Sequence, residues 1–345
     1  MKIGLLTYHH SVSYGATLQT YATCRVLKQL GHEVTLINLP LHNGGRKLSK
    51  ILFYLRDRNT QKLWRKFYPP TTRLFHSSEE LRSEKFSFDY LIVGSDQTWN
   101  PQINCSLCTS FFLDFGDENM KRISYASSFG ISEWPAKYDN LVSDIKKLLS
   151  RFDAISTREV EGQRLLKDKF GFDSTLVIDP TLLNVDYSEL TGEIKPNNKL
   201  ICFTMNRTPQ QLEKVRELAT NMGERPYQMA TIYKLSGFRY IYPPSIPEWL
   251  RLIAGAKFVV TDSFHGLVFC LIYHKQFVVI TPDNGRNSRM QNLLRVVGLE
   301  DRFYNENDDI PYTKLKDEII DYSKVDDILA IEREKSMKFL IDSLA

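Results

Sequence analysis

The sequence has few cysteines and no long hydrophobic run, and these absences exclude several classes of protein. Its 345 residues include five cysteines, an odd number at scattered positions, which argues against a disulfide framework. No apolar segment approaches the roughly 18 residues of a membrane-spanning helix. The first ten residues, MKIGLLTYHH, lack the basic start and long apolar stretch of a secretory signal. We therefore expect a cytoplasmic protein.

Motifs for metals and dinucleotides are also sparse. Cys105 and Cys108 form one CxxC motif, but there is no second pair to complete the four ligands of a structural zinc site. His9 and His10 are adjacent, yet no acidic residue or cysteine stands near them at a metal-ligand spacing. The loop around Gly15 does not have the GxGxxG pattern of a dinucleotide site. We expect neither a metal nor a bound cofactor.

The balance of charges is nearly even, with a net charge of +4 from 45 basic and 41 acidic residues. This small excess suits an anionic substrate and does not require a nucleic acid partner. Basic residues concentrate in an excursion at about residues 44–75, where they alternate with aromatic and aliphatic side chains. Such a segment is typical of an amphipathic helix with a solvated basic face, or of a patch that binds an acceptor or a membrane surface. Both alternatives stay open, as does the oligomeric state.

Short apolar strands alternate with amphipathic helices along the rest of the chain, which is the pattern of α/β proteins. The first 40 residues read as strand, loop, helix and strand, and crossovers of this kind favour a parallel sheet. A polar stretch at residues 184–197 interrupts the pattern before a second α/β run. We predict two Rossmann-like domains facing a cleft, as in glycosyltransferase B, at residues 1–185 and 196–325. The C-terminal helix, residues 326–345, is expected to pack back on the first domain.

Six motifs carry a resemblance to a known family. They are YGATLQTYA (14–22), FDYLIVGSDQTWNP (88–101), ISYASSFG (123–130), STREVEG (156–162), VIDPTLL (177–183) and VVTDSFHG (259–266). In this order and spacing they resemble the polysaccharide pyruvyltransferase family over about residues 1–300.

The resemblance implies a ketal-forming transferase that moves a pyruvyl group from phosphoenolpyruvate, its co-substrate, to a sugar hydroxyl. The acceptor would belong to a cell-surface glycan or its lipid-linked precursor, with the acceptor on the first domain and the donor on the second. Members of the family often carry an arginine two residues before the motif histidine. Here that position is Ser263, so the cation that binds the donor carboxylate is expected elsewhere.

His265 is the strongest catalytic candidate. Pyruvyl transfer requires protonation of an enol methylene, and an imidazole that titrates near neutrality suits this role. The histidine follows the apolar strand FVVTD and precedes a helix, so it is expected at a strand's carboxyl end, where α/β sites form. Ser263 and the amides of Gly266 and Leu267 are candidates for binding the donor phosphate. Alternatively, the TDS segment is only a helix cap and His265 a packing residue.

Several arginines could form an anion clamp for the donor. Arg207 ends the first strand of the second domain, while Arg286, Asn287 and Arg289 follow the strand QFVVIT. A guanidinium group matches carboxylate and phosphate with two parallel hydrogen bonds. Surface salt bridges are the alternative role for these arginines. Arg158, in STREVEG, is predicted to be structural.

Candidates for binding the acceptor lie in two loops of the first domain: Tyr14, Gly15, Gln19, Ser95, Gln97 and Trp99. Gln19 could reach a sugar hydroxyl, and Trp99 could stack on a sugar ring or lie in the core. Asp96 is the second catalytic candidate, because its carboxylate could accept a proton from the acceptor hydroxyl. Equally, it could cap the following turn.

Two other functions remain open. A nucleotide-sugar glycosyltransferase would use the same two domains, with His265 and the arginines on a diphosphate, but no clear ribose-binding carboxylate stands near SFHG. A glycan-binding or assembly protein on an inactivated fold would need no catalytic histidine. Binding of phosphoenolpyruvate compared with UDP or GDP distinguishes these functions.

Overall fold

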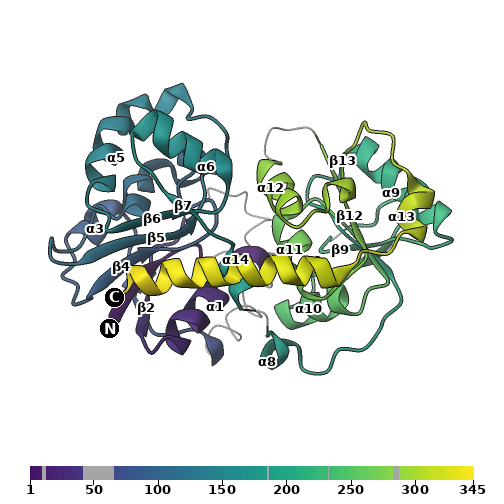
Figure 1. Cartoon of the computed structure of the whole chain (residues 1–345), viewed down its shortest axis with the longest axis horizontal. Coiled ribbons are helices and arrows are strands. Elements are labelled where there is room, and N and C mark those ends of the chain that lie inside the picture. Colours follow the sequence, from purple (N-terminus) through teal and green to yellow (C-terminus); the bar gives the residue numbers. More distant parts are fainter. Residues whose placement is uncertain (10–12, 42–65, 185, 232, 283–286) are drawn as a thin grey trace. The chain divides into compact units, whose positions relative to one another are not determined.

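The computed structural model describes the whole chain except residues 10–12, 42–65, 185, 232 and 283–286 (Figure 1). The described residues form two compact units, each with its own parallel sheet. Unit 1 contains the described chain up to Asn184 together with Ile331–Ala345, and the rest belongs to unit 2. Most of the predicted basic excursion lies outside the described residues.

The described part of unit 1 holds a sheet of seven parallel strands in the order β3-β2-β1-β4-β5-β6-β7. The strands are β1 (Lys2–Leu6), β2 (Glu33–Asn38), β3 (Thr71–Leu74), β4 (Tyr90–Val93), β5 (Lys121–Ser127), β6 (Ala154–Thr157) and β7 (Thr175–Leu176). The strand order reverses between β1 and β4. At such a switch point α/β proteins bind ligands beyond the carboxyl ends of the strands.

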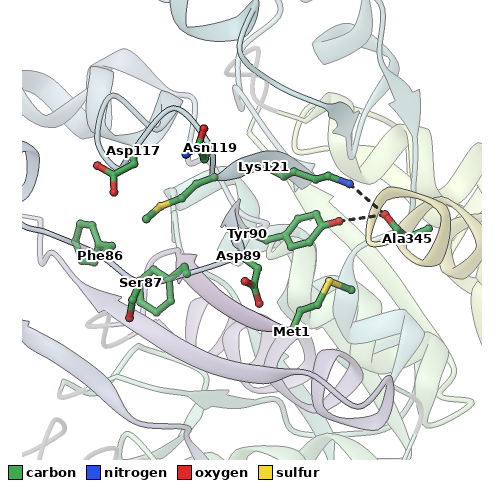
Figure 2. A pocket seen from close by; sticks show the side chains of 11 residues that line it. Met1, Phe86, Ser87, Asp89, Tyr90, Asp117, Asn119, Lys121 and Ala345 are labelled. Atoms are coloured by element: carbon green, nitrogen blue, oxygen red, sulfur yellow. Dashed lines mark hydrogen bonds between the residues drawn. The ribbon is translucent and has the colours of Figure 1, made fainter.

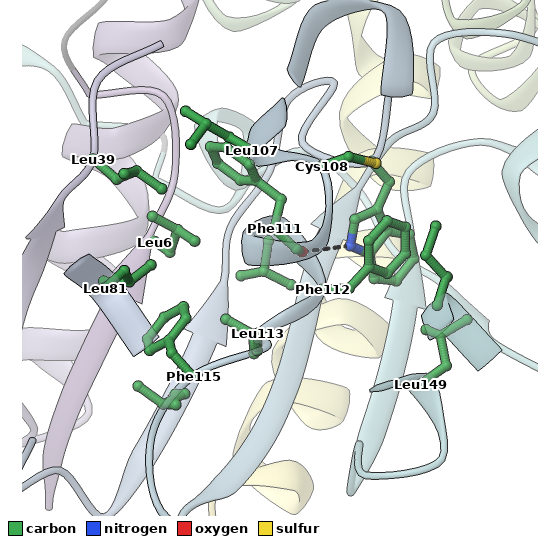
Figure 3. Packing of buried hydrophobic residues seen from close by; sticks show 14 of the residues in the cluster. Leu6, Leu39, Leu81, Leu107, Cys108, Phe111, Phe112, Leu113, Phe115 and Leu149 are labelled. Carbon is green, nitrogen blue, oxygen red and sulfur yellow. Dashed lines mark hydrogen bonds between the residues drawn. The ribbon is translucent and has the colours of Figure 1, made fainter. Parts of the chain in front are cut away.

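Both faces of this sheet are buried, which explains why β4 is apolar at every position. Leu91 and Val93 join one core cluster, whereas Tyr90 and Ile92 join the other, because successive side chains of a strand point to opposite faces. The first cluster is rich in aromatic rings and includes Phe111, Phe112 and Phe115 (Figure 3). The second contains Leu340 and Leu344 from the end of the chain.

The helices of unit 1 follow the strands in the alternating pattern that the sequence predicts. They are α1 (Tyr14–Gln29), α3 (Ser78–Arg82), α4 (Pro101–Asn104), α5 (Val142–Leu149), α6 (Val160–Leu165) and α7 (Pro180–Leu183), with short 3-10 turns at Cys105–Leu107, Thr109–Phe112 and Ala136–Leu141 and a π-helical turn at Leu166–Phe170. β7 ends at Leu176. Pro180 begins α7, and Asp179 caps it by accepting a hydrogen bond from the Thr181 amide (3.0 Å).

Unit 2 repeats the same topology. Its described residues form a sheet of six parallel strands in the order β10-β9-β8-β11-β12-β13, with the reversal between β8 and β11. The strands are β8 (Leu200–Phe203), β9 (Tyr227–Met229), β10 (Arg239–Ile241), β11 (Phe258–Thr261), β12 (Phe277–Thr281) and β13 (Phe303–Asn305). The helices are α8 (Ser188–Thr191), α9 (Pro209–Asn221), α10 (Ile246–Ala254), α11 (Phe264–Ile272), α12 (Ser288–Val296) and α13 (Tyr312–Asp317), with a 3-10 turn at Glu300–Arg302.

The last helix, α14 (Tyr322–Ser343), begins in unit 2 and ends in unit 1. At its start, the Tyr322 hydroxyl donates to the Lys275 carbonyl oxygen. Further along, the Ser336 hydroxyl accepts from the Ile178 amide (3.0 Å), and Leu340 enters the core of unit 1. No helix in the described ranges is long and apolar enough to cross a membrane.

A cavity of about 690 Å³ lies at the amino ends of β4 and β5 (Figure 2). Asp89 and Lys121 line it, and the side chains of Tyr90 and Lys121 both donate to the carbonyl oxygen of Ala345, at 3.3 and 3.1 Å. Ligand sites of α/β proteins form at the carboxyl ends of the strands. This cavity lies at the amino ends, so it is on the opposite edge of the sheet from the expected site.

Candidate functional site

A buried ion network occupies the carboxyl ends of β4, β6 and β7 in unit 1. Arg158 Nη1 lies 2.6 Å from Asp179 Oδ2, and the two side chains are 2% and 0% exposed. The Ser95 hydroxyl also donates to Asp179 (2.9 Å). Glu159 Oε2 lies 3.9 Å from Arg158 Nε, while Glu159 Oε1 accepts from the Ser128 hydroxyl (2.8 Å). The network therefore joins four neighbouring loops and fixes this edge of the sheet.

The charge state of the network follows from the balance around Arg158. Burial lowers the pKa of the guanidinium, but the carboxylates of Asp179, Asp96 and Glu159 raise it by more, so this pKa lies above its ordinary value. The guanidinium stays charged at any ordinary pH. Arg158 thus has the structural position that the sequence predicted, in contact with Glu159.

Asp96 is the most accessible carboxylate of the network. Its side chain is 15% exposed, against 2% for Glu159 and 0% for Asp179, and its Oδ1 lies 3.9 Å from Arg158 Nη2. The same oxygen accepts from the Gln97 amide (2.8 Å), which is the turn-capping role considered as the alternative. The backbone of Asp96 has a φ of 78°, a left-handed conformation that is uncommon for any residue other than glycine. Strain of this kind often marks a functional loop.

Most of the predicted acceptor-binding residues are not accessible. Trp99 is fully buried, donates from Nε1 to the Phe111 carbonyl oxygen (2.9 Å) and stacks on Phe112 with ring centroids 5.2 Å apart. Of the two alternatives for Trp99, stacking on a sugar is therefore excluded and a place in the core is correct. Gln19 is also fully buried and donates to the Thr7 hydroxyl (2.9 Å), so it cannot reach a sugar hydroxyl.

The remaining acceptor candidates divide in the same way. Tyr14, Gly15 and Ser95 are buried, and the Ser95 hydroxyl is engaged by Asp179. Gln97 keeps partial exposure beside Asp96. Asp96 and Gln97 are thus the two predicted residues of unit 1 that a substrate can approach.

In unit 2, Asp262 joins the two loops that flank the switch point. It follows β11, and its carboxylate accepts from the backbone amides of Met205 and Asn206, at 2.6 and 3.0 Å, beyond the end of β8. It also accepts from the side chains of Asn206 (2.9 Å) and Gln211 (3.0 Å). The Asp262 carboxylate therefore shapes the neighbouring loop.

That loop presents Arg207 in a strained conformation, with a φ of 54°. Arg207 Nη2 donates to the Ala230 carbonyl oxygen (3.2 Å) and Nη1 to the Tyr233 hydroxyl (3.4 Å). Both partners are neutral, so the positive charge of Arg207 is not matched by an ion pair within the described residues. Its Nε atom is buried and makes no hydrogen bond there. The predicted anion-binding role is compatible with this environment, whereas the alternative salt bridge is not observed.

His265 is the second residue of α11 and stands next to the switch point between β8 and β11. Its side chain is mostly buried, and the residue is 8% exposed. The Phe264 ring meets the imidazole edge-on, with centroids 5.2 Å apart and an interplanar angle of 88°. The histidine therefore occupies the strand-end position that the sequence predicted, in a fixed environment.

The predicted phosphate site at the start of α11 is wrong in its details. Ser263 is the N-cap, and its hydroxyl accepts from the Gly266 amide (3.3 Å). The Leu267 amide donates to the Ser263 carbonyl oxygen (2.9 Å). Gly266 is a packing requirement, because a Cβ atom there would lie 2.3 Å from Thr261 Oγ1. The cap alternative is correct for Ser263.

Arg289 approaches the same aromatic ring as His265, whereas Asn287 is engaged within its own loop. The Arg289 guanidinium carbon is 5.7 Å from the centre of the Phe264 ring, which in turn contacts His265. Asn287 is buried and holds its own loop, accepting from the Thr281 hydroxyl (3.1 Å) and donating to the Pro282 carbonyl oxygen (2.9 Å). Arg286 lies outside the described residues.

The described residues offer no metal cluster and one exposed thiol. No group of three His, Cys, Asp or Glu side chains that could hold a metal occurs among the described residues. Cys105 is exposed, whereas Cys108 is buried and its thiol pKa is raised to about 12 by burial. Residues that the sequence alone did not identify are Asp262 as the loop anchor and Tyr233 as the partner of Arg207. In neither case does the spacing of the two partners along the sequence indicate the contact.

The two sheets, each in the Rossmann strand order, define a GT-B-like fold. AviGT4, a glycosyltransferase involved in avilamycin A biosynthesis, shares it with a TM-score of 0.54 at 12% identity, over 99% of this chain and 97% of that protein. UDP-GlcNAc 2-epimerase of Methanocaldococcus jannaschii gives 0.52 at 12% identity, over 96% and 99%. UGT89C1 of Arabidopsis thaliana gives 0.52 at 9% identity, over 99% and 98%. These likenesses show the fold alone, and they confirm the predicted fold class.

The family is established by the sequence of the whole site region. The polysaccharide pyruvyl transferase family matches residues 14–284, which include β4, β8 and β11, and the chain belongs to that family. This confirms the resemblance drawn from the six motifs and identifies the protein as a transferase. No curated protein matches the chain in sequence.

Proposed function

We propose that this protein transfers the pyruvyl group of phosphoenolpyruvate to a sugar hydroxyl of a glycan or its lipid-linked precursor. One observation carries the proposal. The family match spans His265 at the switch point of unit 2, and a cation beyond the matched residues, Arg289, lies over the Phe264 ring that His265 also meets. An acid next to a cation is the pair that an anionic enol donor requires.

The donor is assigned to the carboxyl edge of unit 2. Arg207 and Arg289 supply the positive charge for the phosphate and the carboxylate, and Arg207 supports this role because its described partners are neutral. Members of the family often carry an arginine at the position of Ser263, which here caps a helix. Arg207 and Arg289 supply the positive charge in its place. The Asp262 carboxylate holds the loop in which the Arg207 backbone is strained. This fixed loop keeps the Arg207 side chain preorganised.

The chemistry assigned to His265 is protonation of the donor. The imidazolium gives its proton to the enol methylene, which becomes a methyl group, while the sugar oxygen bonds to the neighbouring carbon. The sugar hydroxyl loses its proton to Asp96 or to solvent. Loss of phosphate and attack by a second hydroxyl of the same sugar then close a cyclic ketal, and the second hydroxyl proton leaves with the phosphate.

Asp96 is assigned to the acceptor because it is the carboxylate of its network that a hydroxyl can approach. It keeps its second role in the turn through Gln97. A hydroxyl donating to this carboxylate is oriented for attack, which contributes mainly through positioning.

A direct test incubates the full chain with phosphoenolpyruvate and a panel of saccharides, and follows phosphate release together with the new ketal methyl signal by NMR. We expect His265→Ala to abolish both signals. His32→Ala is the matched control. His32 precedes β2 and so lies at the amino-end edge of the unit 1 sheet, opposite the edge where ligand sites form, and this variant should keep wild-type turnover. Full turnover by His265→Ala on an accepted saccharide would refute the assignment.

Calorimetry tests the donor separately. Phosphoenolpyruvate should bind the wild-type protein, and Arg207→Ala or Arg289→Ala should weaken this binding by roughly tenfold or more, since a charge-assisted hydrogen bond contributes about 1.5–3 kcal/mol. Tight binding of UDP with no binding of phosphoenolpyruvate would favour a nucleotide-sugar transferase instead.

A further inference from the structure

A second cavity of unit 1, of about 440 Å³, lies at the same edge of the sheet as Asp96. We call it the carboxyl-edge pocket. It is lined by Leu41, which follows β2, by His76–Glu79, which follow β3, and by Gln102–Leu107, which follow β4. Its wall is thus built from segments beyond the carboxyl ends of three strands. Its volume falls in the range of about 300–1,000 Å³ that is typical of small-molecule sites.

The lining of this pocket suits an uncharged ligand with many hydroxyl groups. The exposed side chains of Gln102 and Ser106 offer hydrogen-bond donors and acceptors, and Leu41 and Ile103 offer apolar surface. Among the described residues that line it, Glu79 is the single carboxylate, and Arg82 pairs with it at 3.0 Å. A pocket wall without lysine or arginine does not favour phosphate or carboxylate groups.

The wall is held in place by a chain of hydrogen bonds that reaches the Asp96 loop. The Asn104 side chain donates to the Thr98 carbonyl oxygen (2.6 Å), and its Oδ1 lies 2.6 Å from the Tyr8 hydroxyl. The same hydroxyl lies 2.7 Å from the carbonyl oxygen of Gln97, the residue after Asp96. A ligand in the pocket would therefore meet a wall preorganised by the loop that carries Asp96, and preorganisation lowers the entropy cost of binding.

We propose that the carboxyl-edge pocket binds the neutral saccharide portion of the acceptor. The proposal rests on the proposed function, because it supplies the acceptor site for that transfer, but binding to the pocket can be measured without any donor. Sugar rings need both polar partners for their hydroxyls and apolar contact for their C–H faces, and the lining provides both. Asp96, on the adjoining loop, is then the carboxylate beside the bound acceptor.

Cys105 provides a reporter for this pocket. It lines the cavity and is exposed, whereas the other four cysteines of the chain, all of them described, are buried. The rate at which iodoacetamide labels the native full chain therefore measures access to the pocket. Cys105→Ser identifies the reporter, because it should remove the fast-labelling thiol.

The first experiment measures this labelling rate with the methyl glycosides of glucose, galactose, mannose and N-acetylglucosamine, and with phosphoenolpyruvate and inorganic phosphate. We expect at least one glycoside to slow labelling in a saturable way, by about tenfold at ten times its dissociation constant. The two anions should have no effect. Absence of protection by every glycoside, or protection by the anions alone, overturns the proposal.

The second experiment blocks the pocket with Ser106→Trp. The matched control is Ser87→Trp, since Ser87 is an exposed serine of unit 1 that lines the cavity at the opposite edge (Figure 2). We expect Ser106→Trp to abolish glycoside protection of Cys105 and to raise the acceptor KM by about tenfold or more, with donor affinity unchanged. Ser87→Trp should retain both properties. Unaltered protection or an unaltered acceptor KM in Ser106→Trp overturns the proposal.

These measurements separate the two ideas. If phosphoenolpyruvate neither binds nor reacts while a glycoside still protects Cys105, the proposed function fails and the saccharide pocket stands. If transfer occurs but no accepted saccharide protects Cys105, the pocket assignment fails and the function stands. Unchanged thermal unfolding and unchanged phosphoenolpyruvate affinity verify that the Ser106→Trp protein is folded.

Discussion

Removing the Asp262 carboxylate should both destabilise unit 2 and weaken donor binding. The carboxylate accepts four hydrogen bonds, from the amides of Met205 and Asn206 and from the side chains of Asn206 and Gln211. In Asp262→Ala all four are lost, and the strained φ of 54° at Arg207 is no longer imposed. The loop is then free to relax, and the guanidinium loses its fixed position.

The magnitude follows from the number and exposure of the donors. A hydrogen bond contributes about 1 kcal/mol net, and more when one partner is charged. Met205 and Asn206 are exposed and can be rehydrated, and Gln211 keeps a second acceptor in the Ile280 carbonyl oxygen (2.6 Å). We therefore expect Asp262→Ala to cost about 3–4 kcal/mol rather than the larger sum for four charge-assisted bonds. Asp262→Asn turns one oxygen into a donor facing an amide and should cost about 2 kcal/mol.

Hydrogen exchange followed by mass spectrometry is the suitable assay, because the two units need not unfold together. Peptides from β8 and β11 should lose protection by roughly two to three orders of magnitude in Asp262→Ala, since about 1.4 kcal/mol corresponds to tenfold. Peptides from β1 and β4 serve as an internal control and should not change. Calorimetry on the same protein should show weakened phosphoenolpyruvate binding.

Two results would refute this reasoning. If protection of β8 changes by less than about tenfold in Asp262→Ala, the carboxylate does not hold the loop. If protection falls as expected while donor affinity is retained, the loop geometry matters for stability but not for the donor.

Three further outcomes are expected. Gly266→Ala should cost about 1–3 kcal/mol in thermal or urea unfolding, because its Cβ would lie 2.3 Å from Thr261 Oγ1; unchanged stability would contradict this packing. Arg158→Met should cost about 3–5 kcal/mol by leaving the Asp179 carboxylate buried without its cation, and adding Asp179→Asn should recover part of that loss; strictly additive effects would argue against the pair. At pH 8.5 the native protein should have one fast-alkylating thiol, Cys105, and five after denaturation, because burial raises the pKa of each of the other four thiols and so lowers its thiolate fraction.

The central strands could be predicted from the sequence because burial on both faces makes them continuously apolar. β4 and β11 are buried at every position, and both were expected from their runs of apolar residues. The edge strands β3, β10 and β13 were not identified. Their residues are exposed or half-buried, so no hydrophobic period distinguishes them from loops.

The site was predictable to the level of the loop but not to the level of the side chain. Motif position placed His265 and Asp96 after central strands, and the structure puts both at switch points. It could not show that Trp99 turns into the core, since a tryptophan in a loop is equally suited to packing and to stacking. Nor could it reveal that Asp262 reaches across to the β8 loop, because that contact spans 56 residues.

The sequence by itself determined the family, the two α/β runs and the strand-end placement of the histidine, because hydrophobic period and local motifs are encoded within a few neighbouring residues. Only the tertiary structure decided which polar side chains stay accessible, because residues distant along the chain compete for the same hydrogen-bond partners when the strands align. Ser263 became a helix cap and Asp262 a loop anchor through that competition. For the same reason, the Asp96 carboxylate is the one in its network that stays partly exposed.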